Sequence, residues 1–279
     1  MTEMRRSNDA IGRNDPLKTR RPHYGDVARV YALADEWLAS TRRPRNPSAL
    51  IDLVELVPPA SGSTAVDLGS YDGKWAEPVA ARFGCRIVPL DIVQRLMQDA
   101  RGRGLTPVLA DMQHLPFASS SLSLVWSRDA LSMVSEPARV ISETARVLTA
   151  GGGAVLYTAL TTSRLEPLER RELFEALEAP SWWDRGRAPI DDAIARTDLE
   201  VVHEERFSPE NQESALAEAD PALLKDLVVL ARLEREREAF EAMVPGPWAA
   251  RVRAWNSWSI YLLLGKLETR AWVLRKPRH

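Results

Sequence analysis

Cysteine and histidine are both scarce in this sequence. Cys85 is the single cysteine among 279 residues, which excludes an internal disulfide and a cysteine-based metal cage. The four histidines, at positions 23, 114, 203 and 279, do not follow the spacing of metal-ligand motifs. We therefore predict no metal site, and we expect a reducing, cytoplasmic compartment.

Long hydrophobic runs and an excess of either charge are also missing. No apolar stretch approaches the roughly 18 residues of a membrane-spanning helix, and no apolar region follows Arg5 and Arg6 as in a secretory signal. The formal net charge is -2, whereas nucleic-acid-binding proteins usually carry a basic face. We therefore predict neither a membrane span nor a nucleic-acid partner.

Hydrophobic residues make up 45% of the chain and charged residues 27%, which is ordinary for a globular protein with a sizeable core. The changes of pattern along the chain predict five segments. These are a disordered tail (1–21), a helical lid (22–60), an α/β core (61–162), a helical cap with one strand near 199–207 (163–264), and a terminal strand with a tail (265–279).

Short apolar segments alternate with amphipathic ones between residues 64 and 161. Such alternation predicts βαβ units and a parallel sheet, and right-handed crossovers make it doubly wound. We expect a turn at Gly151–Gly153, just before the last of these strands. The expected strands are Thr64–Leu68, Arg86–Leu90, Pro107–Ala110, Ser121–Ser127 and Ala154–Thr161, and the expected helices are Lys74–Arg82, Val93–Arg101 and Pro137–Leu148.

The remaining segments are mostly helical. Glu213–Met243 is charge-laced, with Glu and Arg near i,i+4 spacing, and is interpreted as a solvated helix that can mediate a homodimer. The other expected helices are Tyr24–Ser40, Ala49–Val57, Leu165–Ala179, Pro189–Arg196 and Trp248–Leu264, and the other expected strands are Leu199–Phe207 and Glu268–Arg275.

Three acidic residues stand at the ends of three successive predicted strands. They are Asp67, Asp91 and Asp111, and the carboxyl ends of parallel strands meet at the edge where such sheets bind ligands. A glycine turn, Gly69 to Gly73, follows the first of them. Carboxylates at these points suit a ligand with hydroxyl groups, an amine and a base rich in N–H groups.

The glycine turn does not match the patterns that bind diphosphates. A dinucleotide fingerprint has the form G-x-G-x-x-G, but Tyr71 stands where the second glycine would be, and Asp72 would repel a pyrophosphate. A Gly-Lys-Ser/Thr sequence is absent as well. The ligand is therefore expected to lack a diphosphate.

Several segments, in order, resemble class I S-adenosylmethionine-dependent methyltransferases of the small-molecule type. Val66–Gly73 resembles motif I, Ala110–Phe117 resembles the segment beside the adenine, Ser127–Leu131 resembles the segment after strand four, and Ala145–Gly152 resembles the approach to strand five. The resemblance covers about residues 60–162 and the terminal strand. It implies a Rossmann-like doubly wound sheet, mostly parallel with an antiparallel terminal strand, and S-adenosyl-L-methionine as cofactor.

The resemblance also implies the cofactor-binding residues. Asp91 stands at the ribose-binding position, Asp111 faces the adenine amine with Met112 packing on the ring, and Gly69 lets the backbone approach the methionine moiety. The alternative for Asp67 is to cap the helix that follows, and the alternative for Arg128 is an ion pair with a nearby acidic residue. The full expected set is Asp67, Gly69, Ser70, Gly73, Asp91, Ile92, Asp111, Met112, Ser127 and Arg128.

The sequence departs from the family pattern at two points. Tyr71 replaces the middle glycine of motif I, and Ser132-Met133-Val134 stands where many relatives carry a histidine. The second departure leaves the catalytic residues open, with Tyr24, His23, Glu36 and Tyr157 as candidates for a general base. His114 and His203 are interpreted as solvated or structural.

Aromatic residues outside the α/β core suggest a closed, largely apolar substrate pocket. The candidates are Tyr24, Tyr31, Trp37, Trp182 and Trp183, and the alternative for the tryptophans is the core. We expect methyl transfer to nitrogen, carbon or oxygen of a small organic metabolite of natural-product (secondary) metabolism, by direct displacement with alignment and exclusion of water. The alternative is a non-methylating member of the fold, either a cofactor-binding cyclase or a regulatory or scaffold protein.

Overall fold

The computed structural model describes residues 49–207, 209, 221–244 and 246–278. Its centre is a sheet with strand order β3-β2-β1-β4-β5-β7-β6. The strands are β1 (Thr64–Leu68), β2 (Arg86–Asp91), β3 (Val108–Leu109), β4 (Leu122–Arg128), β5 (Leu148–Thr161), β6 (Glu200–Phe207) and β7 (Leu267–Arg275). β1 to β5 pair in parallel, and β7 is antiparallel to both β5 and β6. The predicted doubly wound sheet with an antiparallel terminal strand is therefore confirmed.

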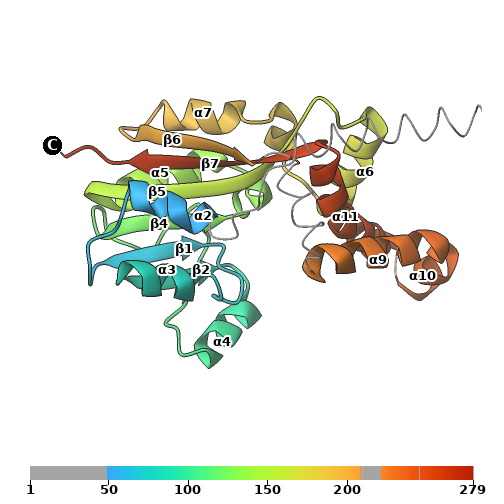
Figure 1. Ribbon diagram of the computed structural model, residues 1–279, viewed down its shortest axis with the longest axis horizontal. Helices are drawn as coiled ribbons and strands as arrows, with labels where there is room; N and C mark the ends of the chain where they lie inside the picture. The colour runs from blue at the N-terminus through green and yellow to red at the C-terminus, as the bar shows by residue number, and fades with distance from the viewer. Residues whose placement is uncertain (1–48, 208, 210–220, 245, 279) are drawn as a thin grey trace, which may run out of the picture. The chain divides into compact units, whose positions relative to one another are not determined.

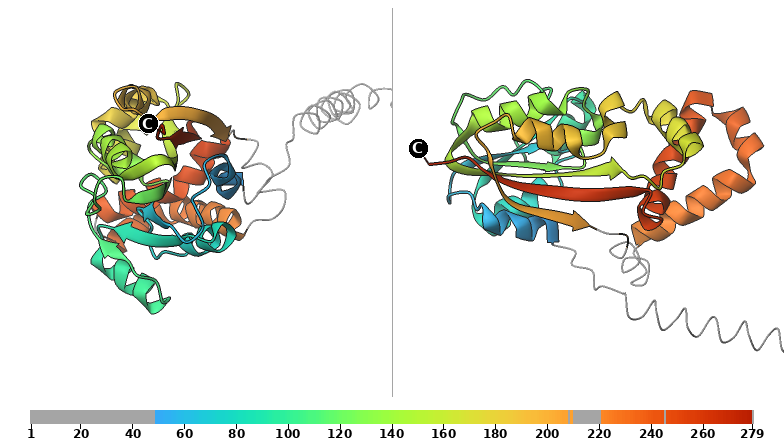
Figure 2. Two further views of the ribbon diagram at one scale, coloured as in Figure 1. Left: turned by 90° about the vertical axis from the view of Figure 1, so that its left-hand side faces the viewer. Right: turned by 90° about the horizontal axis from the view of Figure 1, so that it is seen from above.

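Helices cover both faces of this sheet (Figures 1 and 2). The described helices are α2 (Ala49–Asp52), α3 (Ala76–Phe83), α4 (Gln94–Gly102), α5 (Pro137–Val147), α6 (Pro167–Leu177), α7 (Ala188–Ile194), α9 (Pro221–Arg235), α10 (Arg237–Met243) and α11 (Gly246–Leu263). Three short 3-10 helices are η1 (Leu53–Leu56), η2 (Leu131–Met133) and η3 (Ser181–Arg185). In the part of the chain that the structure describes, none of these helices combines the length and apolar character needed to cross a membrane.

Alternation along the strands divides the core between the two faces. Val66 and Val125 contribute to the cluster beneath α5, α6 and α7, whereas Ala65 and Leu124 join the cluster beneath η1 and α3. β1 is buried along nearly its whole length, as expected for a central parallel strand covered on both faces. This burial fixes the carboxyl end of β1 at the middle of the ligand-binding edge.

The predicted turn at Gly151–Gly153 is wrong, because these glycines lie inside β5. The pairing of β4 with β5 shifts between Leu122 and Leu124, so extra residues of β5 are accommodated there. Gly151 N–H donates to Lys276 O at 2.9 Å, which ties this irregular part to the chain after β7. A Cβ atom at Gly153 would lie 2.3 Å from Val57 Cβ. Gly153 is therefore explained by its close packing against Val57, and a turn is not needed to account for it.

Other boundaries differ from the expected ones. The predicted helix Glu213–Met243 is divided into α9 and α10 at Glu236, and residues 210–220 lie outside the described residues. The helix predicted for Ala49–Val57 is α2 followed by η1. The predicted tail and most of the predicted lid fall within residues 1–48, also outside the described residues.

Trp182 and Trp183 belong to the hydrophobic core. Trp182 Nε1 donates to Val134 O at 2.7 Å, and Trp183 Nε1 donates to Ala159 O at 2.8 Å. The Trp183 ring is stacked between Phe174 and Trp258, with ring centroids 5.4 Å from each. These positions match the core alternative, and substrate contact by either indole stays a prediction.

Candidate cofactor and active site

The loop after β1 is held against β2 by its backbone. The N–H groups of Gly69 and Ser70 donate to Leu90 O at 2.8 and 3.0 Å. Gly69 and Gly73 have φ angles of 67° and 77°, which glycine adopts without steric cost. A Cβ atom at Gly69 would lie 2.3 Å from Ala130 Cβ. The segment after β4 therefore packs directly on this loop, and contact between Gly69 and a ligand stays a prediction.

Asp67 lies at the carboxyl end of β1 and is 2% exposed. Its Oδ2 atom is buried and has no hydrogen-bond partner among the described residues. Burial raises the pKa of Asp67 to about 8, although the nearby Arg128 guanidinium opposes this shift. The helix-capping alternative is wrong, because the N-cap of α3 is Trp75 and no side chain caps it. An unpartnered buried carboxyl group is costly, so Asp67 is suited to contact a polar or cationic ligand.

Three further buried polar atoms around Asp67 have no hydrogen-bond partner among the described residues. They are Ser70 Oγ, Trp75 Nε1 and Trp126 Nε1, and Trp126 is the register partner of Asp67 on β4. The Arg128 guanidinium lies 4.2 Å from the centroid of the Trp75 ring, in a cation–π contact. β1, β4 and the loop after β1 thus carry buried acceptor and donor groups without hydrogen-bond partners among the described residues.

Asp91 ends β2 and accepts two backbone hydrogen bonds. Tyr71 N–H donates to Oδ2 at 3.1 Å, and Val93 N–H donates to Oδ1 at 3.0 Å. Each carboxylate oxygen has a second lone pair, so Asp91 can still accept two hydroxyl groups. The next residue, Ile92, exposes 68% of its surface. An oriented carboxylate and an exposed apolar side chain therefore stand side by side at this edge.

Asp72, which was expected to repel a pyrophosphate, has a structural partner. Its Oδ2 atom is 2.9 Å from Arg103 Nη2, just after α4, and its Oδ1 atom accepts the Lys74 N–H at 3.2 Å. The ion pair ties the glycine loop to α4 and fixes the loop beside Asp91.

Asp111 follows β3 and is oriented by Gln113. The Gln113 backbone N–H donates to Asp111 Oδ1 at 2.8 Å, and Gln113 Nε2 lies 3.2 Å from Oδ2. Gln113 Oε1 accepts hydrogen bonds from Ser135 Oγ and Glu136 N–H, each at 3.0 Å. Met112 is partly buried against the core, and its Cε atom would lie 3.1 Å from a Cβ atom at Gly69. The loop after β3 is thereby connected to the start of α5.

Ser127 is engaged within the sheet. It is fully buried, and its Oγ atom donates to Leu68 O on β1 at 3.2 Å. This bond holds the carboxyl ends of β1 and β4 at a fixed spacing. The structure thus gives Ser127 a structural role, and its predicted contact with the cofactor stays a prediction.

Asp129 directly follows β4 and was missed as a site residue by the sequence analysis. Its φ angle is 59°, which is uncommon for a residue other than glycine and clusters at functional sites. The Ala159 N–H donates to its Oδ1 atom at 3.2 Å. Burial raises its pKa, opposed by this bond and by Arg128. The available signal was its position, since it is a fourth acidic residue at the end of a predicted strand.

Tyr157 is the one candidate general base from the sequence that lies within the described residues. Burial, and then the nearby Asp129 carboxylate, raises its pKa to about 12. Its ring packs edge-on against Phe207, with the centroids 5.4 Å apart. Because its phenolate is rare at neutral pH, Tyr157 is a poor base. The other aromatic and base candidates lie outside the described residues: His23, Tyr24, Tyr31, Glu36 and Trp37.

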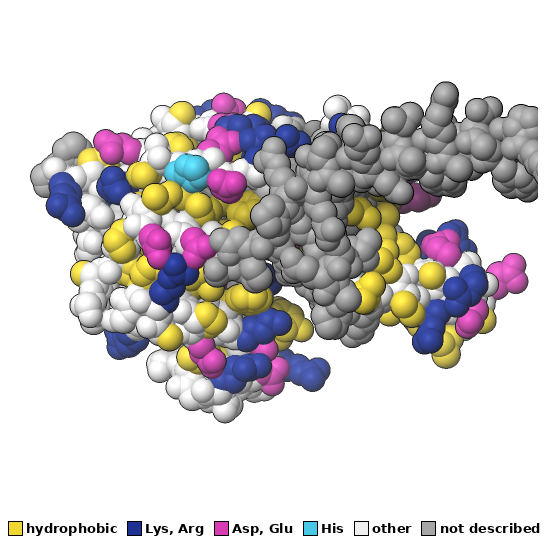
Figure 3. All heavy atoms as spheres, in the orientation of Figure 1, with side chains coloured by type: hydrophobic (Ala, Val, Ile, Leu, Met, Phe, Trp, Pro, Cys, Tyr) yellow, Lys and Arg dark blue, Asp and Glu magenta, His cyan; other side chains and the backbone are white. Residues whose placement is uncertain are grey.

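Two histidines occupy peripheral positions. His114 Nδ1 lies 4.0 Å from Asp111 Oδ2 with an exposed side chain, and His203 Nε2 lies 3.0 Å from Glu205 Oε2 on β6. Both fit the predicted solvated or structural roles. On the face shown in Figure 3, basic and acidic side chains of the described residues are interspersed, without a separate basic surface.

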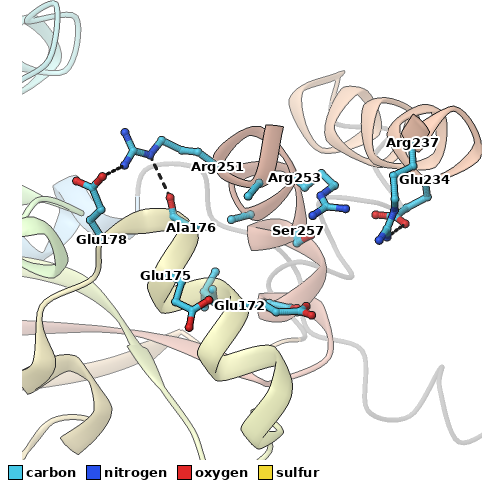
Figure 4. Close-up of a pocket in the computed structure, with 13 residues that line it drawn as sticks. Glu172, Glu175, Ala176, Glu178, Glu234, Arg237, Arg251, Arg253 and Ser257 are labelled. Carbon is cyan, nitrogen blue, oxygen red and sulfur yellow. Dashed lines mark hydrogen bonds and ion pairs between the residues drawn. The ribbon is translucent and has the colours of Figure 1, made fainter. Parts of the chain in front are cut away.

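A cavity of about 480 Å³ lies between α6, α11 and the α9–α10 pair (Figure 4). Its arginines have intramolecular partners: Arg251 pairs with Glu178 at 2.6 Å, and Arg237 pairs with Glu234. None of the strand-end carboxylates lines it. The cavity therefore adds no group to the candidate site.

Comparison with known proteins identifies the family. A family model described as a methyltransferase domain matches residues 66–156. A dimethylglycine N-methyltransferase from Parasynechococcus marenigrum (strain WH8102) is 30% identical over 194 residues, covering 63% of this chain and 68% of that protein. The chain belongs to the class I S-adenosylmethionine-dependent methyltransferases. It is a methyltransferase of the small-molecule type, as the sequence predicted.

Solved structures share the fold of this methyltransferase. Phosphoethanolamine N-methyltransferase 2 from Haemonchus contortus, in complex with S-adenosyl-L-methionine, has a TM-score of 0.60 at 20% identity, covering 87% of this chain and 56% of that one. The 4+2 cyclase SpnF has a TM-score of 0.56 at 18% identity, covering 82% of this chain and 80% of that one. The predicted cofactor, S-adenosylmethionine, is confirmed by the family.

The chemistry of the edge residues fits this cofactor. Asp67 Oδ2 and Ser70 Oγ are buried without partners among the described residues, and Asp91 retains free lone pairs beside the exposed Ile92. S-adenosylmethionine carries an ammonium, a carboxylate, two ribose hydroxyls and a flat adenine. The methyltransferase thus offers acceptors, donors and apolar surface for each of these groups.

Proposed function

We propose that this methyltransferase acts on a nitrogen atom of a small, largely apolar organic amine, and that Asp129 accepts the proton which that amine must lose. The observation that carries the proposal is a partly buried carboxylate directly after β4, beside the loop that follows β1. Burial raises its pKa, and a base works best when its pKa lies near the working pH.

Five residues at or near this edge support the proposed cofactor contacts. We place the ribose hydroxyls on Asp91, the adenine amine on Asp111 and the ammonium group on Asp67. Arg128 and Trp75 Nε1–H, which has no partner among the described residues, are donors suited to the carboxylate. Bound S-adenosylmethionine supplies a methyl group already activated by its sulfonium. The remaining task of the protein is alignment, exclusion of water and removal of a proton.

The apolar character of the acceptor is supported by exposed side chains at the same edge. They are Val93 (46% exposed), Leu109 (50%) and Met133 (47%). The choice of nitrogen is favoured by Asp129, because a carboxylate attracts an ammonium and can then deprotonate it. The dimethylglycine relative and the phosphoethanolamine structure also carry N-methyltransferase names. Secondary metabolism and a cytoplasmic location stay predictions.

Binding and product mass test this proposal together. Titration calorimetry with S-adenosylhomocysteine establishes cofactor binding. Purified protein and S-adenosylmethionine are then incubated with matched panels of apolar amines, phenols and carbon acids, and products are analysed by mass spectrometry. We expect an amine to gain the mass of one methylene group. Methylation confined to phenols or carbon acids would overturn the assignment to nitrogen.

The alternative is a cofactor-binding enzyme that does not methylate. This alternative is favoured by the fold likeness to the cyclase SpnF and by Ser132-Met133-Val134, which stands where many relatives carry a histidine. Under it, S-adenosylhomocysteine binds, but no acceptor gains mass and the S-adenosylmethionine concentration stays constant. A polyene substrate converted to an isomer of equal mass would decide in its favour.

A further inference from the structure

Tyr71 occupies a backbone conformation that favours glycine. Its φ angle is 55°, in the left-handed region that costs side-chain-bearing residues free energy. It stands at the position where motif I of the resembling family carries a glycine. A bulky aromatic residue is thus kept at a position where glycine would fit without strain.

The phenol ring of Tyr71 lies largely outside the packed core. The residue exposes 63% of its surface. The contact that locates it is made by its backbone, whose N–H donates to Asp91 Oδ2 at 3.1 Å. A glycine could donate the same hydrogen bond. Any role of the Tyr71 side chain therefore lies at the protein surface, outside the packed interior.

The position of the Tyr71 backbone limits the ligands that its ring can contact. The Tyr71 N–H is in contact with the carboxylate assigned to the ribose, and the exposed Ile92 directly follows that carboxylate. The flanking residue Asp72 is fixed by Arg103 at 2.9 Å. Position 71 is therefore held beside the adenosine site before a ligand arrives.

We propose that Tyr71 determines cofactor affinity, with its phenol ring packing over the adenosine part of S-adenosylmethionine that Asp91 anchors. The proposal rests on the assignment of Asp91 to the ribose. Burial of an exposed aromatic face against a ribose or purine is favourable. That gain offsets the backbone strain only when the cofactor is bound, which explains an aromatic residue in place of glycine.

Three variants test this inference. Tyr71→Gly removes the ring and the strain, and Tyr71→Phe keeps the ring without the hydroxyl. Ser120→Gly is the matched control, because Ser120 has a φ angle of 53° just before β4 begins, at the opposite edge of the sheet. The dissociation constant of S-adenosylhomocysteine is measured by calorimetry and the melting temperature by differential scanning fluorimetry.

The expected result separates affinity from stability. Tyr71→Gly should raise the dissociation constant about 10-fold, while its melting temperature is not lowered relative to the parent. Tyr71→Phe should stay within about 3-fold, since stacking needs only the ring, and Ser120→Gly should bind like the parent. In steady state, KM for S-adenosylmethionine should rise for Tyr71→Gly with little change in kcat.

Three outcomes would contradict the inference, each at a different point. Parent-like binding by Tyr71→Gly, in a protein that binds the cofactor product, removes the role of Tyr71 but leaves the methyltransferase assignment intact. Failure of the parent itself to bind S-adenosylhomocysteine overturns both. Parent-like binding by a variant of Asp91 would contradict the ribose assignment on which the inference rests.

Discussion

Asp91 and Asp111 differ from Asp67 and Asp129 in the hydrogen bonding and burial of their carboxylates. The first two, at the ends of β2 and β3, accept backbone hydrogen bonds at 2.8–3.1 Å from their own or a neighbouring loop. The second two, at the ends of β1 and β4, lie nearer the middle of the sheet, and burial raises the pKa of both. We call these the outer pair and the inner pair.

This difference separates recognition from proton chemistry. The outer pair is oriented in advance, so its oxygens suit hydrogen bonds from a ribose and an adenine. The inner pair carries fewer hydrogen bonds, so its protonation depends on what binds next to it. Under the proposed function, the same residue type therefore serves two purposes at one edge, according to the position of its strand in the sheet.

The largest expected effect comes from removing the inner carboxylate beside β4. Asp129→Asn keeps the size of the side chain but cannot accept the proton of an amine. We expect kcat to fall about 100-fold or more, with an unchanged dissociation constant for S-adenosylhomocysteine. Single-turnover kinetics with an amine acceptor measures the change. Full turnover by this variant would show that the inner pair does not perform proton transfer.

The raised pKa of Asp67 predicts that the free energy of unfolding depends on pH. The pKa of its carboxyl group is about 8 in the folded protein, against 3.8 as its ordinary value. Between these values the folded state holds a proton that the unfolded chain has lost. The contribution of Asp67 to the free energy of unfolding is therefore most favourable below about pH 4 and falls as pH rises to about 8, by at most about 1.4 kcal/mol per pH unit.

Asp67→Asn tests that slope, because its side chain does not titrate. Urea unfolding at several pH values between 5 and 9 should show a flatter dependence for the variant than for the parent. Calorimetry in buffers of different ionisation enthalpy should show proton release when S-adenosylhomocysteine binds to the parent, and less for Asp67→Asn. Equal pH slopes for both proteins would mean that Asp67 is ionised throughout.

The outer pair and Asp67 were predictable from sequence because each follows an apolar strand, and strand ends of a parallel sheet converge. Asp129 was not recognised, because Arg128 beside it offered a simple ion pair. Its positive φ angle and its burial exist only once β4 and β5 are paired. Sequence therefore located the edge and the cofactor, but it did not distinguish which carboxylates are buried.

Packing explains the other differences. Gly151 and Gly153 resembled a turn, yet close contact with Val57 and pairing with the chain after β7 place them in a strand. Trp182 and Trp183 allowed two interpretations, since composition alone cannot show whether an indole meets a ligand or the core. Contacts between segments distant in sequence decide such cases.

Removal of an outer carboxylate should weaken cofactor binding. Asp91→Ala deletes the proposed acceptor for the ribose hydroxyls, and hydrogen bonds to a charged group contribute about 1.5–3 kcal/mol. We expect the dissociation constant of S-adenosylhomocysteine to rise about 10- to 100-fold, as measured by calorimetry. Parent-like binding by this variant would contradict the assignment of the ribose to Asp91.

The smallest expected effect tests whether backbone contacts are what hold the outer pair. Gln113→Ala removes the Nε2 contact to Asp111, but the backbone N–H at 2.8 Å remains. We expect the dissociation constant to rise only about 3-fold, because the retained backbone hydrogen bond still orients the carboxylate. Ser135→Ala, which removes only the outer bond to Gln113 Oε1, should have less effect still. If Gln113→Ala weakens binding as much as Asp91→Ala, then side-chain contacts, not the backbone, orient Asp111, and the distinction between the pairs fails at that strand.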